Sequence, residues 1–159
     1  MRKSRPKNKV VQVMPFFDMQ IREIMTHEIV TISPAASAAD AARLMREADV
    51  GILPVVDGDK VAGVVTDRDL VVRVMAAGLD KTCTPVRDVM TAEVVYCFED
   101  EDVQAAVYSI EARQVRRVLV LDRKQKLVGV LSLGDIAVDT GNKFVAGDAL
   151  KKVSEPTHN

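Results

Sequence analysis

An internal duplication constrains the fold of this chain more than any other feature of its sequence. Residues 21–70 and residues 86–136 align from end to end, with one extra residue in the second copy at the turn RKQK. Such self-similarity indicates that the chain builds one structural unit twice. The positions of the first copy that meet the same residue type in the second are Arg22, Met25, Thr26, Val55, Asp57, Gly63, Val64 and Asp69.

Each copy has the pattern of a β-α-β-β-α unit. A short strand follows the shared Met-Thr pair, at Glu28–Ile32 and again at Glu93–Cys97, and an amphipathic helix comes next. The apolar runs ILPVV and VLVL are typical of strands covered on both faces, and polar turns lead from them to third strands. A final helix ends near Gly78 in one copy and near Gly141 in the other. The sequence therefore predicts an α/β fold of two repeats related by a pseudo-twofold axis.

This pattern divides the chain into five segments. Neither copy has enough strands and helices to enclose a core alone, so we expect the two copies to share one core. The expected segments are a basic N-terminal arm with an apolar stretch (1–20), the first repeat (21–80), a connector (81–85), the second repeat (86–141) and a C-terminal tail (142–159).

Composition indicates an aliphatic core and no strong overall charge. Apolar residues make up 48% of the sequence but aromatic residues only 4%, and the formal net charge is −1 at pH 7. That charge gives no general attraction to nucleic acid or to an anionic membrane. No stretch has the roughly 20 apolar residues that cross a bilayer, and no secretory signal is evident. We therefore expect a soluble cytoplasmic protein without membrane association.

The reactive side chains do not suggest catalysis or metal binding. The two histidines and two cysteines of the chain form no metal-ligand cluster in the sequence. We expect Cys97 to be a small buried residue, whereas Cys83 in the connector leaves a redox role or an intersubunit disulfide open. The sequence has no evident nucleophile–base pair and no P-loop lysine, so an enzyme is the weakest hypothesis.

The two repeats end in the junctions GVVTDRDL and GVLSLGDI, which admit two interpretations. A hydroxyl residue followed three positions later by an acid is a common capping box, and capping explains Thr66 with Asp69 and Ser132 with Asp135. The same residues can also hold a ligand, because free backbone N–H groups and the helix dipole favour a phosphate at a helix start. Taken alone, the short motif favours capping.

The motifs taken together resemble a known family. The opening DVMT, the strand GILPVVD and the ending GVVTDRDL resemble tandem cystathionine-β-synthase (CBS) domains, which make up a Bateman module. Several motifs occur in order in both copies, and the resemblance spans residues 21 to about 141. Residues 64–80, together with QVRRVLVLD from Gln114, are similar to the small stand-alone bacterial proteins of the hypoxic response protein family.

The resemblance implies a regulatory protein without enzymatic activity that binds adenosine-containing ligands in clefts between the repeats. AMP, ADP and ATP are the expected ligands, S-adenosylmethionine and NAD are further candidates, and no other cofactor is required. Two modules are expected to pair as a homodimer that passes a ligand-dependent change to an unknown protein partner. The implied nucleotide-binding residues are Thr31, Val50, Gly51, Ile52, Thr66, Arg68, Asp69, Val115, Arg116, Arg117, Ser132 and Asp135.

The junction residues have distinct expected roles within this set. The carboxylates of Asp69 and Asp135 suit the 2′ and 3′ hydroxyls of ribose, and the junction hydroxyls can donate a hydrogen bond to a phosphate. Arg68 offers a phosphate contact in the first copy, whereas Gly134 replaces it in the second. We therefore expect the first junction to be better equipped for phosphate.

The middle strands add expected contacts of two kinds. Arg116 and Arg117 are adjacent in an extended segment, so their side chains should point to opposite faces, with one in a cleft. The guanidinium group suits phosphate by its planar set of donors, although an ordinary surface pair is an equally open interpretation. Residues 50–52, with Val115 opposite, would line an adenine slot, and plain core packing is the alternative for their side chains.

Two further hypotheses remain open at this point. In the first hypothesis the clefts are degenerate or empty, and the chain is a constitutive dimeric interaction protein. The SLGD sequence of the second junction would favour this hypothesis. The N-terminal segment has five basic residues and no acid among its first nine positions. This arm can therefore contact nucleic acid or an acidic partner, or it is a solvated end of the chain.

Overall fold

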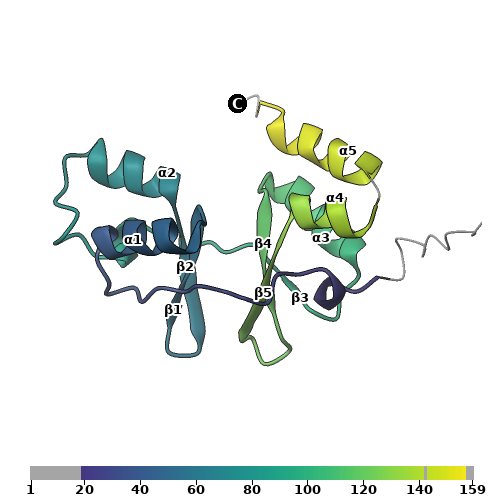
Figure 1. Cartoon of the computed structure of the whole chain (residues 1–159), viewed down its shortest axis with the longest axis horizontal. Helices are drawn as coiled ribbons and strands as arrows, with labels where there is room; N and C mark the ends of the chain where they lie inside the picture. Colours follow the sequence, from purple (N-terminus) through teal and green to yellow (C-terminus); the bar gives the residue numbers. More distant parts are fainter. Residues whose placement is uncertain (1–18, 142, 157–159) are drawn as a thin grey trace, which may run out of the picture.

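The structure of the protein is a computed structural model that describes residues 19–141 and 143–156. Figure 1 shows two units side by side, each with helices at one end and a β-hairpin at the other. The basic arm expected in the first 18 residues lies outside the described residues. Within the described ranges, no helix is long and apolar enough to cross a bilayer.

The first repeat contains one hairpin and two helical segments. Its two strands pair antiparallel around a tight turn at Gly58, which has a φ of 59°. The second helical segment begins as an α-helix and continues directly as a π-helix. In chain order the elements are α1 (Ala38–Ala48), β1 (Ile52–Asp57), β2 (Lys60–Thr66), α2 (Asp67–Asp69) and the π-helical η3 (Leu70–Met75).

The second repeat has the same order of elements preceded by one additional strand, so its sheet has three strands where that of the first repeat has two. Its first strand runs parallel to the second, and the second pairs antiparallel with the third. In chain order the elements are β3 (Tyr96–Phe98), α3 (Val103–Arg113), β4 (Arg117–Leu121), β5 (Leu127–Ser132) and α4 (Leu133–Asp139). The predicted α/β fold of two repeats is therefore confirmed.

The opening strands are shorter than predicted. In the first repeat only Ile32 pairs, through a parallel bridge to Val55, and in the second repeat pairing begins at Tyr96. Residues 28–30 line a cleft between the repeats instead of extending the sheet. The apolar pattern therefore identified extended chain correctly but not where sheet pairing begins.

A helix that the sequence analysis did not predict covers the second repeat. Helix α5 (Lys143–Ser154) packs against α3 and α4, with Ala146 and Ala149 buried (Figure 1). The corresponding helices of the first repeat have no such cover within the described part of the chain. Val71, Val72 and Met75 of η3 are exposed there, Met75 to 74%.

The interior forms two hydrophobic clusters, one in each repeat, so the prediction of a single shared core is wrong. Each cluster is nevertheless closed by a turn from the other repeat. The 3₁₀ turn η2 (Ile21–Glu23) contributes Ile21 to the cluster of the second repeat. The 3₁₀ turn η4 (Val86–Asp88) contributes Val86 to the cluster of the first repeat. Apolar periodicity shows which side chains are buried but not which copy they are buried against.

After each exchanged turn, the shared Met-Thr pair crosses the third strand of the other repeat. The amide of Thr26 donates to the Val130 carbonyl at 2.9 Å, and the Val130 amide donates back at 3.1 Å. Thr91 and Val64 form the equivalent pair of hydrogen bonds at 2.8 and 2.9 Å. The two repeats are therefore joined by backbone pairing at two symmetric points.

This crossing explains the glycine that begins each junction. A Cβ on Gly63 would lie 2.6 Å from the carbonyl oxygen of Thr91. A Cβ on Gly129 would lie 2.5 Å from the sulfur of Met25 and 3.2 Å from the Thr26 carbonyl oxygen. We call the Met-Thr pair that crosses each strand, residues 25–26 or 90–91, the crossing segment. Glycine is required where the strand and the crossing segment approach each other.

Candidate functional site

Two clefts open between the repeats, one at each junction. We define the large cleft, of about 610 Å³, by residues 64, 66–69, 91, 93–95 and 114–117, with Gly51, Ile52 and Leu119. The small cleft, of about 240 Å³, is defined by residues 26, 28–30 and 49–52, with Pro54, Arg117, Val130, Ser132 and Asp135. Each junction therefore faces residues of the other repeat.

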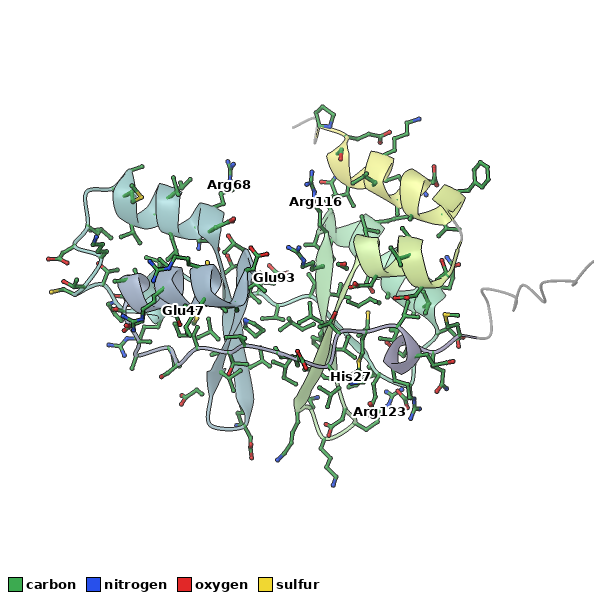
Figure 2. All side chains as sticks on the ribbon, viewed as in Figure 1. His27, Glu47, Arg68, Glu93, Arg116 and Arg123 are labelled. Atoms are coloured by element: carbon green, nitrogen blue, oxygen red, sulfur yellow. The ribbon has the colours of Figure 1, made fainter. Side chains whose placement is uncertain are left out.

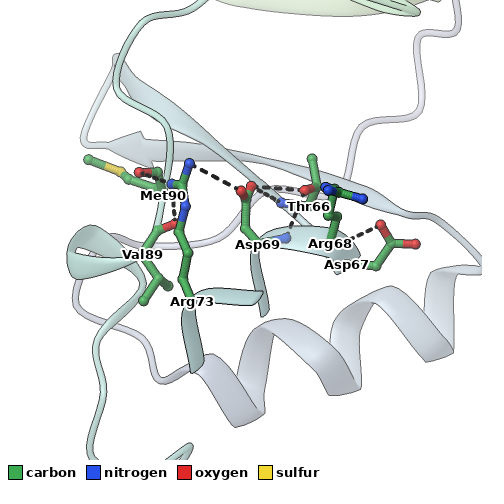
Figure 3. A network of polar contacts seen from close by, with 7 residues as sticks. All are labelled: Thr66, Asp67, Arg68, Asp69, Arg73, Val89 and Met90. Atoms are coloured by element: carbon green, nitrogen blue, oxygen red, sulfur yellow. Dashed lines mark hydrogen bonds and ion pairs between the residues drawn. The ribbon is translucent and has the colours of Figure 1, made fainter. Parts of the chain in front are cut away.

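At the large cleft, Thr66 and Asp69 form a complete capping box at the start of α2 (Figure 3). The Asp69 oxygen Oδ2 accepts hydrogen bonds from the Thr66 amide at 2.9 Å and the Thr66 hydroxyl at 2.8 Å. That hydroxyl accepts in turn from the Asp69 amide at 3.1 Å. The other oxygen, Oδ1, lies 3.5 Å from Nη2 of Arg73. Capping is therefore present, and Oδ1 is the oxygen left for a ligand.

The first three amides of α2 already have hydrogen-bond acceptors. The Asp67 amide donates to the Gly51 carbonyl at 3.0 Å, and the Arg68 amide donates to the Asp67 carboxylate at 2.7 Å. The third amide, from Asp69, is held by the cap. The expectation that free amides at this helix start would receive a phosphate is therefore wrong, and the donors must come from side chains.

Three arginines supply such donors at the large cleft. Arg68, Arg116 and Arg117 are exposed, and their guanidinium groups have no ion pair or hydrogen bond within the described residues. Figure 2 shows Arg68 and Arg116 on facing sides of the gap between the repeats. A planar guanidinium group without a partner is well suited to phosphate oxygens.

The two adjacent arginines do not divide between cleft and solvent as predicted. Both Arg116 and Arg117 line the large cleft, and Arg117 also lines the small one. Strand β4 begins only at Arg117, so Arg116 precedes the strand and is not subject to its alternation. The large cleft thereby gains a positive charge that the sequence analysis did not assign to it.

The second junction repeats the capping box with nearly the same distances. Oδ2 of Asp135 accepts from the amide and the hydroxyl of Ser132, both at 2.7 Å. Oδ1 of Asp135 has no partner in the part of the chain that the structure describes, because Asp139 occupies the position that Arg73 has in the first repeat. The two caps are alike, and their surroundings are not.

The small cleft also differs in charge. The carboxylates of Glu28, Asp49 and Asp135 line it together with a single guanidinium group, that of Arg117. The large cleft also has three carboxylates, those of Asp67, Asp69 and Glu93, but three guanidinium groups line it. Glu93 is in addition paired at 3.0 Å with Arg113, which is outside that group of three arginines. A phosphate group is therefore better accommodated electrostatically in the large cleft.

The predicted adenine-slot residues are divided between the two clefts. Val50 lines the small cleft and Val115 lines the large one, so they do not face each other as expected, whereas Gly51 and Ile52 line both. Thr31 lines neither cleft and lies in a separate surface hollow with His27 and Lys126. Side chains alternate along extended chain, which turns Thr31 away from the face that Val30 presents.

Other cleft residues were missed by the sequence analysis. Val94 and Val95 supply an apolar wall of the large cleft, and Thr91 lies beside them. Their counterparts at residues 29, 30 and 26 line the small cleft. The identity of Thr26 and Thr91 was the available signal, because a polar residue shared by both copies next to a strand indicates a common position.

Metal binding and thiol chemistry have no support at either cleft. Residues 19–141 and 143–156 contain no group of three or more histidine, cysteine, aspartate or glutamate side chains that could hold a metal ion. Cys83 is exposed, and Cys97 is buried in the second repeat, as predicted for a small core residue. Burial raises the pKa of the Cys97 thiol above its ordinary value.

Comparison with known proteins agrees with this architecture. The family model described as CBS domain matches residues 21–76 and 86–138. The chain is 36% identical over 134 residues to CBS domain-containing protein YhcV of Bacillus subtilis, covering 84% of this chain and 94% of that protein. It is 34% identical over 117 residues to Hypoxic response protein 1 of Mycobacterium tuberculosis, covering 73% and 81%.

Solved structures lead to the same family. The crystal structure of Hypoxic Response Protein I with two coordinated zinc ions has a TM-score of 0.68 at 33% identity, covering 75% of this chain and 97% of that one. The CBS domain pair of protein MJ0100, in complex with 5′-methylthioadenosine and S-adenosyl-L-methionine, has a TM-score of 0.69, covering 79% and 98%. Its 24% identity supports a shared fold alone. The chain therefore belongs to the CBS domain family, with one CBS domain in each repeat.

Proposed function

We propose that the protein is a regulatory module without enzymatic activity that binds an adenine nucleotide in the large cleft. The observation that carries this proposal is the group of Arg68, Arg116 and Arg117, three guanidinium groups without partners in the described residues. They surround a cleft of about 610 Å³, within the range of roughly 300–1,000 Å³ typical of small-molecule sites. The small cleft, at about 240 Å³, lies below that range.

The lining residues match the three parts of a nucleotide. The side chains of Val94, Val95 and Val115 offer apolar contacts to a purine ring. Oδ1 of Asp69 offers an acceptor to a ribose hydroxyl, since Oδ2 is used by the cap. The three arginines offer charge-assisted hydrogen bonds to the phosphate oxygens. No other cofactor is needed for this role.

The charge of the cleft favours nucleoside phosphates over a sulfonium ligand. S-adenosylmethionine carries a positive sulfur next to the ribose, which would lie near Arg68 and Arg116. AMP, ADP and ATP place negative charge there and should bind more tightly as the number of phosphates increases. NAD has a diphosphate and should bind more weakly than ADP, because its second nucleoside extends beyond the adenosine contacts.

Family membership supports the regulatory half of the proposal. The CBS domain pair of MJ0100 shares this fold and is in complex with two adenosine-containing ligands, so the fold is able to hold the ligand class proposed here. We further propose that two modules pair through the first repeat, where Val71 and Val72 are 54% and 51% exposed beside Met75. Exposed apolar groups of this kind mark interaction surfaces. Sedimentation at micromolar concentration should then show a dimer.

The test is isothermal titration calorimetry of the full chain with AMP, ADP, ATP, S-adenosylmethionine, NAD and unphosphorylated adenosine. We expect ATP to bind most tightly, adenosine most weakly, and the affinity for ATP to fall as salt is raised, because the arginines are exposed. A bound ligand at 100 times its Kd should also stabilise the fold by about 2.7 kcal/mol.

One alternative remains, a constitutive dimeric interaction protein with empty clefts. The divergent second junction favours it, since Gly134 and Asp139 remove two of the charges present at the first. Absence of heat with every ligand, together with a stable dimer, would establish this alternative in place of nucleotide binding.

A further inference from the structure

Arg73 connects the first junction to the second repeat. Its Nη1 donates to the main-chain carbonyls of Val89 at 2.8 Å and of Met90 at 3.0 Å, while Nη2 lies 3.5 Å from Oδ1 of Asp69 (Figure 3). Among the described residues, Arg73 is the one arginine whose side chain donates to main-chain carbonyls. One guanidinium group therefore contacts both the candidate ribose acceptor and a segment of the other repeat.

The carbonyls that accept hydrogen bonds from Arg73 lie next to a place where the two repeats are joined. Val89 is buried in the cluster of the first repeat, and Met90 precedes the residue that crosses β2. That residue, Thr91, pairs with Val64 through two backbone hydrogen bonds and lines the large cleft. Arg73 thus fixes the chain immediately before one of the two points where the repeats are joined.

The second repeat has no counterpart of this contact. The residue aligned with Arg73 is Asp139, and the carbonyls aligned with those of Val89 and Met90 belong to Ile24 and Met25. Within the described chain, no side-chain donor reaches these two carbonyls. The exposed Asp139 carboxylate could not donate to them, so the contact is a property of the large cleft alone.

The local helix geometry differs at the same place. Directly after Asp69 the helix widens into the π-helical η3, in which the Ala76 amide donates to the Val71 carbonyl at 2.9 Å. The equivalent helix α4 is α-helical throughout. Single π-helical turns are rare and are often found at functional sites. Arg73 lies within this turn, so the widened helix carries the side chain that links cleft and crossing segment.

We infer that Arg73 is a positioning residue that orients Asp69 for the ribose and transmits occupancy of the large cleft to the crossing segment of the second repeat. The inference rests on the proposed nucleotide binding and extends it. A ribose hydroxyl on Oδ1 adds a second partner to the carboxylate that Arg73 holds. The guanidinium group is then fixed from both sides, and residues 89–91 are held more firmly against β2.

We expect Arg73 and a ribose hydroxyl to contact Oδ1 of Asp69 at the same time and not to compete for it. A carboxylate oxygen can accept two hydrogen bonds, and Oδ1 has only the long 3.5 Å contact with Arg73. One acceptor position on Oδ1 therefore stays open. A hydrogen bond from a hydroxyl to a carboxylate is charge-assisted and therefore stronger than one between neutral groups.

The first test is a double-mutant cycle in ATP binding, using Arg73→Met, Asp69→Asn and the double variant in the full chain. We expect Arg73→Met to raise the Kd for ATP five- to tenfold, and the double variant to bind no more weakly than Asp69→Asn alone. Such non-additivity shows that Arg73 acts through Asp69. Arg73→Lys keeps the positive charge but lacks the planar N–H donors of the guanidinium group, so it should recover only part of the affinity for ATP.

The matched control is Arg87→Gln, which removes an exposed arginine of η4 whose contact to Asp88 is 3.9 Å long and lies outside both clefts. This variant should bind ATP within twofold of the wild type. Additive losses in the cycle would overturn the positioning role, because a general structural effect of Arg73 does not depend on Asp69.

Hydrogen exchange separates this inference from the proposed function. ATP should slow amide exchange in residues 89–91 of the wild type at least threefold more than in Arg73→Met. If the wild type binds no nucleotide, the proposed function fails and the transmission fails with it. Amide exchange in residues 89–91 of the ligand-free proteins then tests the contact of Arg73 with this segment by itself. Equal exchange rates in the wild type and in Arg73→Met would overturn the role of that contact.

Discussion

The junctions at Thr66 and Ser132 have the same capping geometry and face clefts of different size and charge. In both, Oδ2 of the aspartate accepts hydrogen bonds from the backbone amide and the hydroxyl of the residue three positions earlier, at donor–acceptor distances of 2.7 to 2.9 Å. Each cleft has two carboxylates besides that of its junction, Asp67 and Glu93 in the large cleft and Glu28 and Asp49 in the small one. Three guanidinium groups without partners in the described residues line the large cleft, whereas Arg117 alone lines the small one. The repeated motif therefore specifies a helix start, and the residues around it determine what the cleft can bind.

The largest expected effect tests whether charge distinguishes the two clefts. The double variant Arg116→Gln/Arg117→Gln should raise the Kd for ATP about 100-fold, because each charge-assisted hydrogen bond is worth about 1.5–3 kcal/mol and 1.4 kcal/mol is a factor of ten. Titration calorimetry at fixed salt measures the change.

The control for that variant is Arg43→Gln/Arg46→Gln, which removes two exposed charges from α1 outside both clefts. It should change the Kd less than threefold. Equal losses in the two double variants would show that net charge, and not the arrangement at the large cleft, attracts the nucleotide.

The order of elements could be predicted from sequence because its signals are local. Apolar periodicity and the hydroxyl–acid spacing depend on neighbouring residues, and both caps formed as the spacing predicts. The exchange of opening turns could not be predicted, since Ile21 and Val86 have the same apolar character whichever copy buries them. Helix α5 was missed because its alanines and lysines suit a solvated tail as well as a helix packed on one face.

The candidate site was predictable in its residue types and less so in its geometry. Arg68 and Asp69 were identified by the junction motif and Arg116 by the pair of adjacent arginines before the middle strand, and the three residues do line one cleft. The division of Val50 and Val115 between two clefts follows from the way the repeats cross, which no local pattern encodes. The occupied amides of α2 depend on the Gly51 carbonyl and the Asp67 carboxylate, and a capping motif does not specify these acceptors.

The second prediction compares the two crossing points. Gly63→Ala should lower the free energy of unfolding by about 2–3 kcal/mol, because the added Cβ meets a backbone oxygen that cannot move without breaking the pairing of Thr91. Gly129→Ala should cost about 1 kcal/mol, since the main obstacle is the flexible Met25 side chain. Urea unfolding of both variants measures the difference. Equal costs would indicate that both crossings adjust to the same extent.

The third prediction compares the two carboxylates. Asp69→Asn should raise the Kd for ATP about tenfold, because it removes the charge that strengthens the ribose contact. Asp135→Asn should change that Kd less than twofold, since Asp135 lines the small cleft. Both variants retain an oxygen for the cap, so the apo stability of each should fall by less than the roughly 1 kcal/mol that a cap is worth. Unaltered ATP affinity in both would place the nucleotide elsewhere.

The smallest expected effect contrasts Cys97 with Ile32, the residue aligned with it in the first repeat. Burial raises the pKa of the Cys97 thiol; the hydrogen bond to Ser109 lowers it and the nearby Glu101 charge raises it. In the unfolded chain the thiol titrates near its ordinary value of about 8.5. Above that pH the unfolded chain loses a proton that the folded protein keeps, so the free energy of unfolding falls as pH rises.

The stabilisation linked to the thiol is thus complete below about pH 8.5 and is lost as pH rises towards the higher pKa of the folded state. Between pH 7.5 and 9.5 the wild type should lose up to about 1.4 kcal/mol more stability than Cys97→Val, which makes the second repeat resemble the first at this position. Urea unfolding under reducing conditions at both pH values measures this difference. The same loss in both proteins would mean that the thiol titrates alike in the folded and unfolded chains, so that burial does not raise the pKa of Cys97.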